Sequence, residues 1–145
     1  MGQVVNPEAL RLSLEAVRAG LTNRTLTRVL LDFTVTLEFI DPRPRIQVKL
    51  EDVFTLVDAT GLRVDVDPMR LGMQAGDVAR LFGAVVGGVD IHADGTLELR
   101  FEDGRVISAP PGDTESWSYS EDGGPFIVCG PSDVSYWPAP DKESP

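Results

Sequence analysis

His92, the only histidine of the chain, is the first candidate for chemistry, because a neutral imidazole can act as a general base or bind a metal. It lies in Asp90-Ile91-His92-Ala93-Asp94-Gly95, where a strand-like stretch runs into a turn. A catalytic histidine needs a positioned partner and a nucleophile or water, and nothing in this sequence supplies them. The pattern therefore favours a surface turn histidine over a catalytic one.

The other reactive side chains also lack the spacing of a known site. Cys129 lies in an apolar, strand-like run, where cysteine behaves as a small buried hydrophobe. Asp65 and Asp67 share one strand face, and Asp90 and Asp94 bracket a turn, but neither pair has the spacing of a calcium loop. No glycine-rich loop opens a helix in a phosphate-binding pattern, and no serine lies in a nucleophile elbow. We therefore expect no catalytic residue, metal or cofactor, and no enzyme.

Charge is the compositional bias with functional content. The net charge is -10, and the excess is uneven: residues 1–101 hold eleven basic and fourteen acidic residues, whereas residues 102–145 hold two and nine. An acidic surface repels phosphates, which opposes binding to nucleic acid or to an anionic membrane and favours a basic protein partner. The alternative is that the acidic residues serve only solubility.

Aromatic side chains accompany the acidic C-terminal third. Trp and Tyr dominate interface hot spots, but Trp117 and Tyr119 match core positions of the first half, so we expect them in the core. Acidic residues flank them in predicted loops. If a partner-binding face exists, we expect it to comprise Asp113, Glu115, Glu121, Asp122 and Asp133.

The elements that would position these residues occur twice. The segment Asp32 to Asp41 aligns without a gap with the segment Asp94 to Asp103, and five residues are identical in the two segments: Asp, Thr, Leu, Phe and Asp. A helix with Asn6 as cap and Pro7 at its first turn precedes the first copy and ends at Gly20, and a shorter helix capped by Asp77 precedes the second. Alternating apolar residues then predict about five short strands in each half.

This pattern predicts the fold class and the domain organisation. We expect an α+β fold, dominated by antiparallel sheet, built from two similar halves related by a pseudo-two-fold axis. The whole chain, 1–145, is predicted to be a single domain, with pseudo-repeats 7–70 and 71–137. The polar, proline-rich segment 138–145 is predicted to be a disordered tail.

The compartment follows from what the sequence lacks. We see no basic segment followed by an apolar run at the N-terminus, and no stretch of about 18 apolar residues, so we expect a soluble protein with no membrane contact. A single cysteine fits a reducing compartment. These features predict a cytoplasmic protein of unknown oligomeric state.

Four motifs give the chain a family resemblance. They are Asp67-Pro68, the run Gly95 to Gly104 (Gly-Thr-Leu-Glu-Leu-Arg-Phe-Glu-Asp-Gly), Glu115-Ser116-Trp117, and the closing Trp137. Together they resemble an uncharacterised family of small acidic proteins, common in actinobacteria and known as a domain of unknown function. The resemblance covers about residues 20–137 and leaves out the N-terminal helix. It implies a bacterial protein and transfers no catalytic residue.

Two functions of different classes remain open. The first is a non-catalytic, immunity-like protein that binds a basic protein partner through its acidic C-terminal face. The second is a small-ligand binder or an enzyme with a pocket between the two halves. A deep apolar cleft there, containing His92 or paired carboxylates, would favour the second hypothesis, and a filled interface would count against it.

Overall fold

Residues 6–140 are described by the computed structural model, and their first element is the predicted N-terminal helix, α1 (Pro7–Leu21). The Asn6 side chain accepts hydrogen bonds from the backbone N–H groups of Glu8 and Ala9, at 3.0 and 3.3 Å. These bonds satisfy two donors that have no partner within the helix. The sequence therefore predicted this helix and its cap correctly.

The described residues then form eleven strands and one short helix. All but one of the strands are four or five residues long. Strands 46–50, 54–57, 97–101 and 106–109 alternate buried and more exposed side chains, as the sequence pattern predicted, whereas all five residues of strand 35–39 are buried. The elements are β1 (Arg28–Leu31), β2 (Val35–Phe39), β3 (Ile46–Leu50), β4 (Phe54–Val57), β5 (Arg63–Val66), α2 (Gln74–Ala79), β6 (Val86–Ile91), β7 (Leu97–Phe101), β8 (Val106–Ala109), β9 (Trp117–Glu121), β10 (Phe126–Cys129) and β11 (Val134–Trp137).

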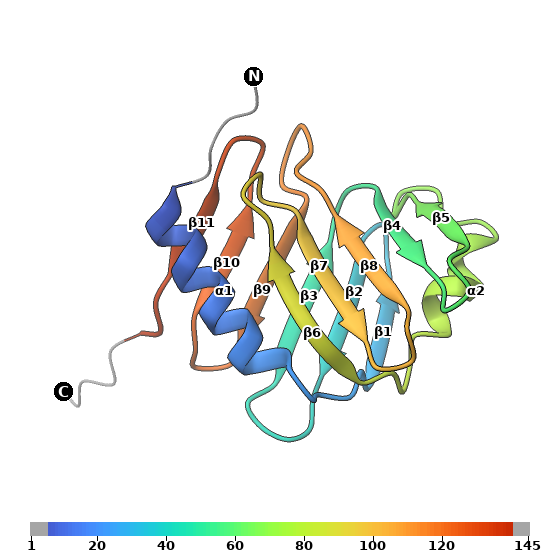
Figure 1. Cartoon of the computed structure of the whole chain (residues 1–145), viewed down its shortest axis with the longest axis horizontal. Helices are drawn as coiled ribbons and strands as arrows, with labels where there is room; N and C mark the ends of the chain where they lie inside the picture. Colours follow the sequence, from blue (N-terminus) through green and yellow to red (C-terminus); the bar gives the residue numbers. More distant parts are fainter. Residues whose placement is uncertain (1–5, 141–145) are drawn as a thin grey trace.

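The strands form two antiparallel sheets, so the fold is α+β with few helices (Figure 1). One sheet has six strands in the order β1-β2-β3-β9-β10-β11, and the other has five in the order β5-β4-β8-β7-β6. The helix α1 lies against β6 and β11, which are end strands of the two sheets. It therefore covers the side of the molecule where these two strands lie.

The space between the sheets is filled by buried side chains from both. Trp117 and Tyr119 are fully buried, as predicted, and Cys129 is buried beside them. The Trp117 Nε1 donates to the carbonyl of Gly95 at 2.9 Å, which satisfies a polar group in the core. The core between the two sheets is therefore packed, while the hollows that residues of both halves line together lie at the molecular surface.

The short helix differs from its prediction. Asp77 was expected to cap it, but α2 begins at Gln74 with Met73 at the cap position, so Asp77 lies inside the first turns. Val78 and Leu81 are buried, whereas Phe82, which follows the helix, is 65% exposed. One turn of helix carries too few periodic positions for its boundaries to be predicted from apolar spacing.

Each half of the chain contributes strands to both sheets. The first half places β1, β2 and β3 in the six-stranded sheet and β4 and β5 in the other. The second half reverses this arrangement, with β6, β7 and β8 in the five-stranded sheet and β9 and β10, followed by β11, in the other. The halves therefore meet along two strand pairs, β3 with β9 and β4 with β8.

A third contact between the halves joins the segments that precede β1 and β6. Thr25 bridges Val85 in antiparallel fashion. Around this bridge the N–H of Leu26 donates to the carbonyl of Ala84, and the N–H of Val86 donates to that of Arg24. The segment 141–145, which contains most of the predicted tail, lies outside the described residues.

Candidate functional site

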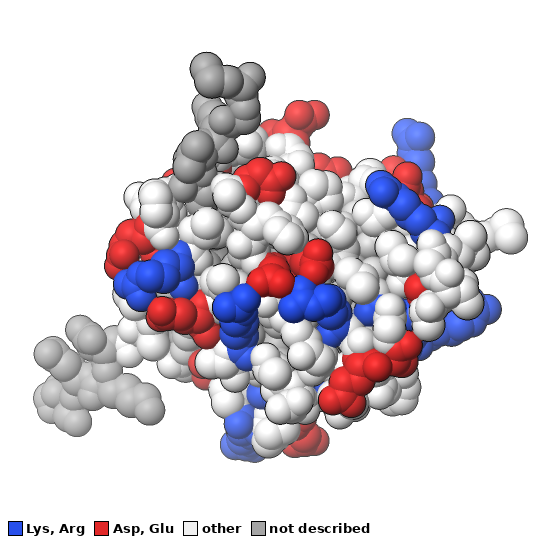
Figure 2. Space-filling view, in the orientation of Figure 1, with Lys and Arg blue, Asp and Glu red and all other residues white. Residues whose placement is uncertain are grey.

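His92 lies on the outer side of the five-stranded sheet, in a network of ion pairs. Its Nε2 is 3.2 Å from Glu98 Oε1, and its side chain is half exposed. Arg100 contacts Glu98 and lies 2.6 Å from Asp90 Oδ2, while Arg18 of α1 lies 2.6 Å from Asp90 Oδ1. Figure 2 shows this mixture of acidic and basic side chains across α1, β6 and β7.

These contacts explain the state of the carboxylates around His92. The hydrogen bond from Arg100 lowers the pKa of Glu98 and also lowers that of Asp90. Both carboxylates are therefore held in the charged form by arginine, and the lowered pKa makes each of them a weaker base. The geometry is that of a surface ion-pair network that joins α1 to the sheet.

Cys129 is buried in the core, as its apolar surroundings predicted. Its Sγ lies 3.6 Å from the carbonyl oxygen of Gly95. Burial raises the pKa of this thiol, which disfavours the thiolate that nucleophilic chemistry would require. The side chain therefore acts as a packing group.

The five carboxylates predicted to bind a partner do not share one face. Strand β9 separates them, because Asp113 and Glu115 precede its first residue and Glu121 and Asp122 stand at its end. Asp133, in the turn before β11, lies near the beginning of β9, since Trp117 pairs with Cys129 and Cys129 pairs with Val134. The structure thus groups three of the five residues at one end of the six-stranded sheet and two at the other.

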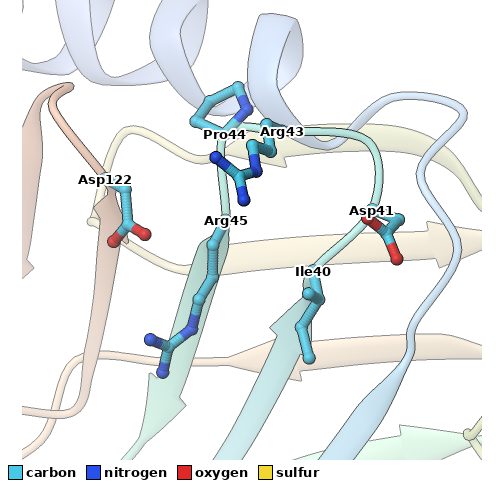
Figure 3. A pocket seen from close by; sticks show the side chains of 6 residues that line it. All are labelled: Ile40, Asp41, Arg43, Pro44, Arg45 and Asp122. Atoms are coloured by element: carbon cyan, nitrogen blue, oxygen red, sulfur yellow. The ribbon is translucent and has the colours of Figure 1, made fainter.

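The end with Glu121 and Asp122 contains a cavity of about 640 Å³ beneath the β2–β3 loop (Figure 3). The charged residues that line it are two aspartates, Asp41 and Asp122, and two arginines, Arg43 and Arg45. Their formal charges balance, so this cavity has no net attraction for a basic partner. Glu121 accepts a hydrogen bond from the Tyr119 hydroxyl at 2.9 Å, so one of its carboxylate oxygens already has a partner within the protein.

The opposite end is strongly acidic. We define the acidic end as residues 32–34, 51–53, 67–71, 113–116 and 130–133, which are loop segments at one end of the six-stranded sheet. The strand register brings segments 32–34, 51–53 and 113–116 together, because Leu31, Val35, Leu50 and Trp117 are successive cross-strand partners. Segment 130–133 joins them because Trp117 also pairs with Cys129. These segments hold seven aspartates and glutamates and a single arginine.

An exposed phenylalanine stands at this acidic end in an unusual backbone conformation. Phe33, in the turn between β1 and β2, has φ of 51° and is 67% exposed. A positive φ costs a side-chain-bearing residue roughly 1 kcal/mol. In the sequence repeat its counterpart is Gly95, at φ of 98°, which adopts such a conformation without that cost.

Phe33 and Met69 form a ridge between two hollows. Both residues line a hollow of about 270 Å³, whose other walls are Leu31, Asp32, Pro68 and Leu71. Both also line a second hollow of about 450 Å³, together with Thr34, Glu51, Thr114 and Glu115. Met69 is 61% exposed. The first hollow is mostly apolar, and the second contains two carboxylates.

Glu51, in the second hollow, has an environment that opposes its ionisation. Burial raises the pKa of Glu51, and the adjacent Glu115 raises it further by charge repulsion and hydrogen bonding. Lys49 offsets only part of this effect. A cation placed between the two side chains would relieve the repulsion.

Sequence analysis identified Glu115 of this site but missed its other principal residues. Phe33 and Met69 read as ordinary apolar residues of a repeat and a turn, and Glu51 as a polar residue after a strand. One available signal was the repeat itself, because it aligns Phe33 with Gly95 at a turn that favours glycine. The proximity of segments 51–53 and 113–116 depends on β3 pairing with β9, which the repeat did not predict.

Among the described residues, no helix is long and apolar enough to cross a membrane. Nor do the described residues contain a cluster of three or more His, Cys, Asp or Glu side chains arranged to bind a metal ion. No curated protein and no solved structure matches the chain. The model of DUF6188, a family of unknown function, matches residues 17–137, from the last turns of α1 to the end of β11, and the chain therefore belongs to this family.

Proposed function

We propose that this protein is a non-catalytic binding protein that captures a basic protein partner through its acidic end, in the manner of an immunity protein. One observation carries the proposal: an exposed apolar ridge, Phe33 and Met69, stands among loops with seven carboxylates and one arginine. An apolar anchor surrounded by charge of one sign is the arrangement of a specific interface steered by electrostatics.

The rest of the molecule supports a binding role. His92 and Cys129, the two side chains with most catalytic potential, are occupied by an ion-pair network and by core packing. The acidic surface disfavours nucleic acid and anionic lipid as partners. We place the protein in the cytoplasm, because its one cysteine is a reduced core residue in this fold.

The test uses the partner captured from extracts of the protein's own host, then purified. We expect its association rate to fall on the order of tenfold between low and high salt, because charge steers the encounter. Asp113→Asn with Asp133→Asn removes two charges at the acidic end and should slow association in low salt.

A matched variant provides the control. Asp41→Asn with Asp122→Asn removes the same number of charges at the opposite end and should leave the rate nearly unchanged. Equal effects of the two double variants, or an association rate independent of salt, would contradict the proposal. Capture alone does not support it.

We further infer that the fold is an internal duplication with a pseudo-two-fold axis near Thr25 and Val85. The strand exchange between the sheets supports this inference. The first half gives three strands to the six-stranded sheet and two to the other, whereas the second half gives three to the five-stranded sheet and two, followed by the additional strand β11, to the six-stranded one. The pairing registers also correspond: Phe54 with Val66 and Trp117 with Cys129 are pairs of equivalent residues, 63 positions apart in the sequence.

The hydrogen bonds at the proposed axis support the same inference. Arg24 bonds to Val86 and Leu26 bonds to Ala84. Under a spacing of 60 positions, Ala84 is the counterpart of Arg24 and Val86 that of Leu26, so each bond joins a residue to the counterpart of the other. The N–H of Asn23 donates to the carbonyl of Val86, and the N–H of Gly83 donates to that of Leu26. Asn23 and Gly83 both have positive φ, at 68° and 86°. A two-fold axis through the Thr25–Val85 bridge would exchange the Asn23–Val86 bond with the Gly83–Leu26 bond. It would likewise exchange the Leu26–Ala84 bond with the Val86–Arg24 bond.

A further inference from the structure

Phe33 has no role within the fold that explains its side chain. It stands at a backbone position that favours glycine, and two-thirds of its surface is exposed. The turn requires only its backbone, because the N–H of Asp32 donates to the carbonyl of Thr34 and closes the loop around Phe33. The positive φ of Phe33 costs free energy, and its exposed side chain gains little from burial in return. We therefore look for the reason for this side chain in function and not in stability.

The hollow on one side of Phe33 fits an apolar side chain. Leu31, Pro68, Met69 and Leu71 supply most of its lining, and its volume is about 270 Å³. Leu71 packs against the hydrophobic core, and this packing holds the Leu71 side of the hollow in place. A leucine, methionine or phenylalanine side chain of a partner would bury apolar surface there on both molecules.

The hollow on the other side fits a cationic side chain. Glu51 and Glu115 face the same space, and burial together with the neighbouring Glu115 keeps the pKa of Glu51 raised. An arginine or lysine head group between them would offset the repulsion between the carboxylates and form charge-assisted hydrogen bonds with them. Thr34 and Thr114 add hydroxyl groups to the same lining.

We propose that the Phe33–Met69 ridge binds an extended segment of the basic partner in which an apolar residue is adjacent to an arginine or lysine. Successive side chains of an extended segment point to opposite sides. A backbone lying along the ridge therefore places one side chain in the apolar hollow and the next in the Glu51–Glu115 hollow. The inference rests on the proposed function and names the feature that the partner must present.

Charge complementarity selects this occupant over a second copy of the chain. The chain carries a net charge of -10, and the acidic end holds seven of its carboxylates. Two acidic ends brought together would repel each other. A basic segment gains both from the surrounding charge and from the paired carboxylates.

The test is an NMR titration of the whole protein with three synthetic peptides of equal length, which alternate leucine with arginine, serine with arginine, and leucine with glutamate. We expect the leucine–arginine peptide to shift the amide signals of residues 31–34, 51, 69, 114 and 115. The serine–arginine peptide should bind at least tenfold more weakly, and the leucine–glutamate peptide should not bind.

Two variants test the hollows separately. Phe33→Gly should weaken binding of the leucine–arginine peptide at least tenfold and should fold normally, because glycine relieves the strained φ. Glu51→Gln should weaken binding and reduce its dependence on salt. Phe82→Ala is the matched control, since Phe82 is 65% exposed but lies away from both hollows, and it should bind as the original protein does.

The outcomes separate the inference from the proposed function. If the leucine–arginine peptide does not bind, or if Phe33→Gly binds it as tightly as the original protein, the ridge is not the docking site and the inference fails. The proposed function still stands in that case if the Asp113→Asn, Asp133→Asn variant slows association with the purified host partner. Peptide shifts confined to residues outside the acidic end would overturn the inference as well.

Discussion

Glu38 is a charged residue of strand β2 whose side chain is buried. Its side chain is 1% exposed, although the strand pattern predicts it on the polar face of β2. Arg45 Nη2 lies 2.5 Å from Oε2, Gln47 donates to the same oxygen, and Arg28 Nε is 3.6 Å from Oε1. Burial alone would raise the pKa of Glu38, but these donors and charges outweigh it and lower the pKa.

The lowered pKa predicts a pH-dependent loss in Glu38→Gln. The folded state stabilises the charged carboxylate, so its contribution is present above the usual carboxyl pKa of about 4 and is lost as the pH falls through the folded-state value. Urea unfolding should show a loss of about 1–2 kcal/mol at pH 7, which shrinks toward zero in acid. Glu102→Gln, at an exposed position, is the control; an equal loss at both pH values would indicate packing instead of charge.

At the scale of the element, α1 depends on a glycine for its position. A Cβ at Gly20 would lie 2.0 Å from the Tyr119 hydroxyl and 3.0 Å from Ile46 Cδ1. The sequence pattern predicts that the helix ends at Gly20, but α1 continues to Leu21, and the glycine instead permits close contact with the sheet. A helix end and a close approach both favour glycine, so the sequence alone could not distinguish them.

Gly20→Ala should therefore destabilise the protein despite the better helix propensity of alanine. Propensity favours alanine by about 1 kcal/mol, whereas overpacking against a buried ring costs about 1–3 kcal/mol. We expect a net loss of about 1–2 kcal/mol in thermal or urea unfolding. Gly76→Ala in α2, where the nearest atoms are 3.9 Å away on the flexible Arg80, should instead be neutral or stabilising. A stable Gly20→Ala variant would show that α1 can move without cost.

At the scale of the whole molecule, the two halves are held together by strand pairing. β3 pairs with β9 over five residue pairs, and β4 pairs with β8 over three. The repeat predicts two similar halves of the chain, and the structure places strands of both halves in each of the two sheets. Neither half contains a complete sheet of its own, so neither is expected to fold alone.

This arrangement predicts the behaviour of a cut chain. A protease site inserted between Gly72 and Met73 falls in an exposed connection, where Met73 is 93% exposed. After cleavage the two fragments should remain together, elute as one species and keep a native circular dichroism spectrum, because the β3–β9 and β4–β8 pairs and the Thr25–Val85 bridge join them. The uncut insertion variant is the control. Fragments that separate in native buffer would show that the connection itself maintains the fold.

Part of the candidate site could be predicted from the sequence. Glu115 and Asp113 were identified as partner-binding candidates, and they lie at the acidic end with Asp133. Glu121 and Asp122 were predicted to lie with them, but the length of β9 places them at the opposite end of the sheet. Their separation is a property of strand direction, which acidic composition does not reveal.

The sequence by itself determined the local structure: the capped helix α1, the alternating strands, the buried Trp117 and Tyr119, and the antiparallel α+β class. These depend on capping, periodicity and burial, which act over a few residues. Only the tertiary structure decided which strands became neighbours and which loops therefore met. Pairing β3 with β9 brought Glu51 beside Glu115 at the acidic end, where Phe33 and Met69 separate their hollow from the apolar one. Such contacts join residues more than sixty positions apart, and local preferences carry no information about them.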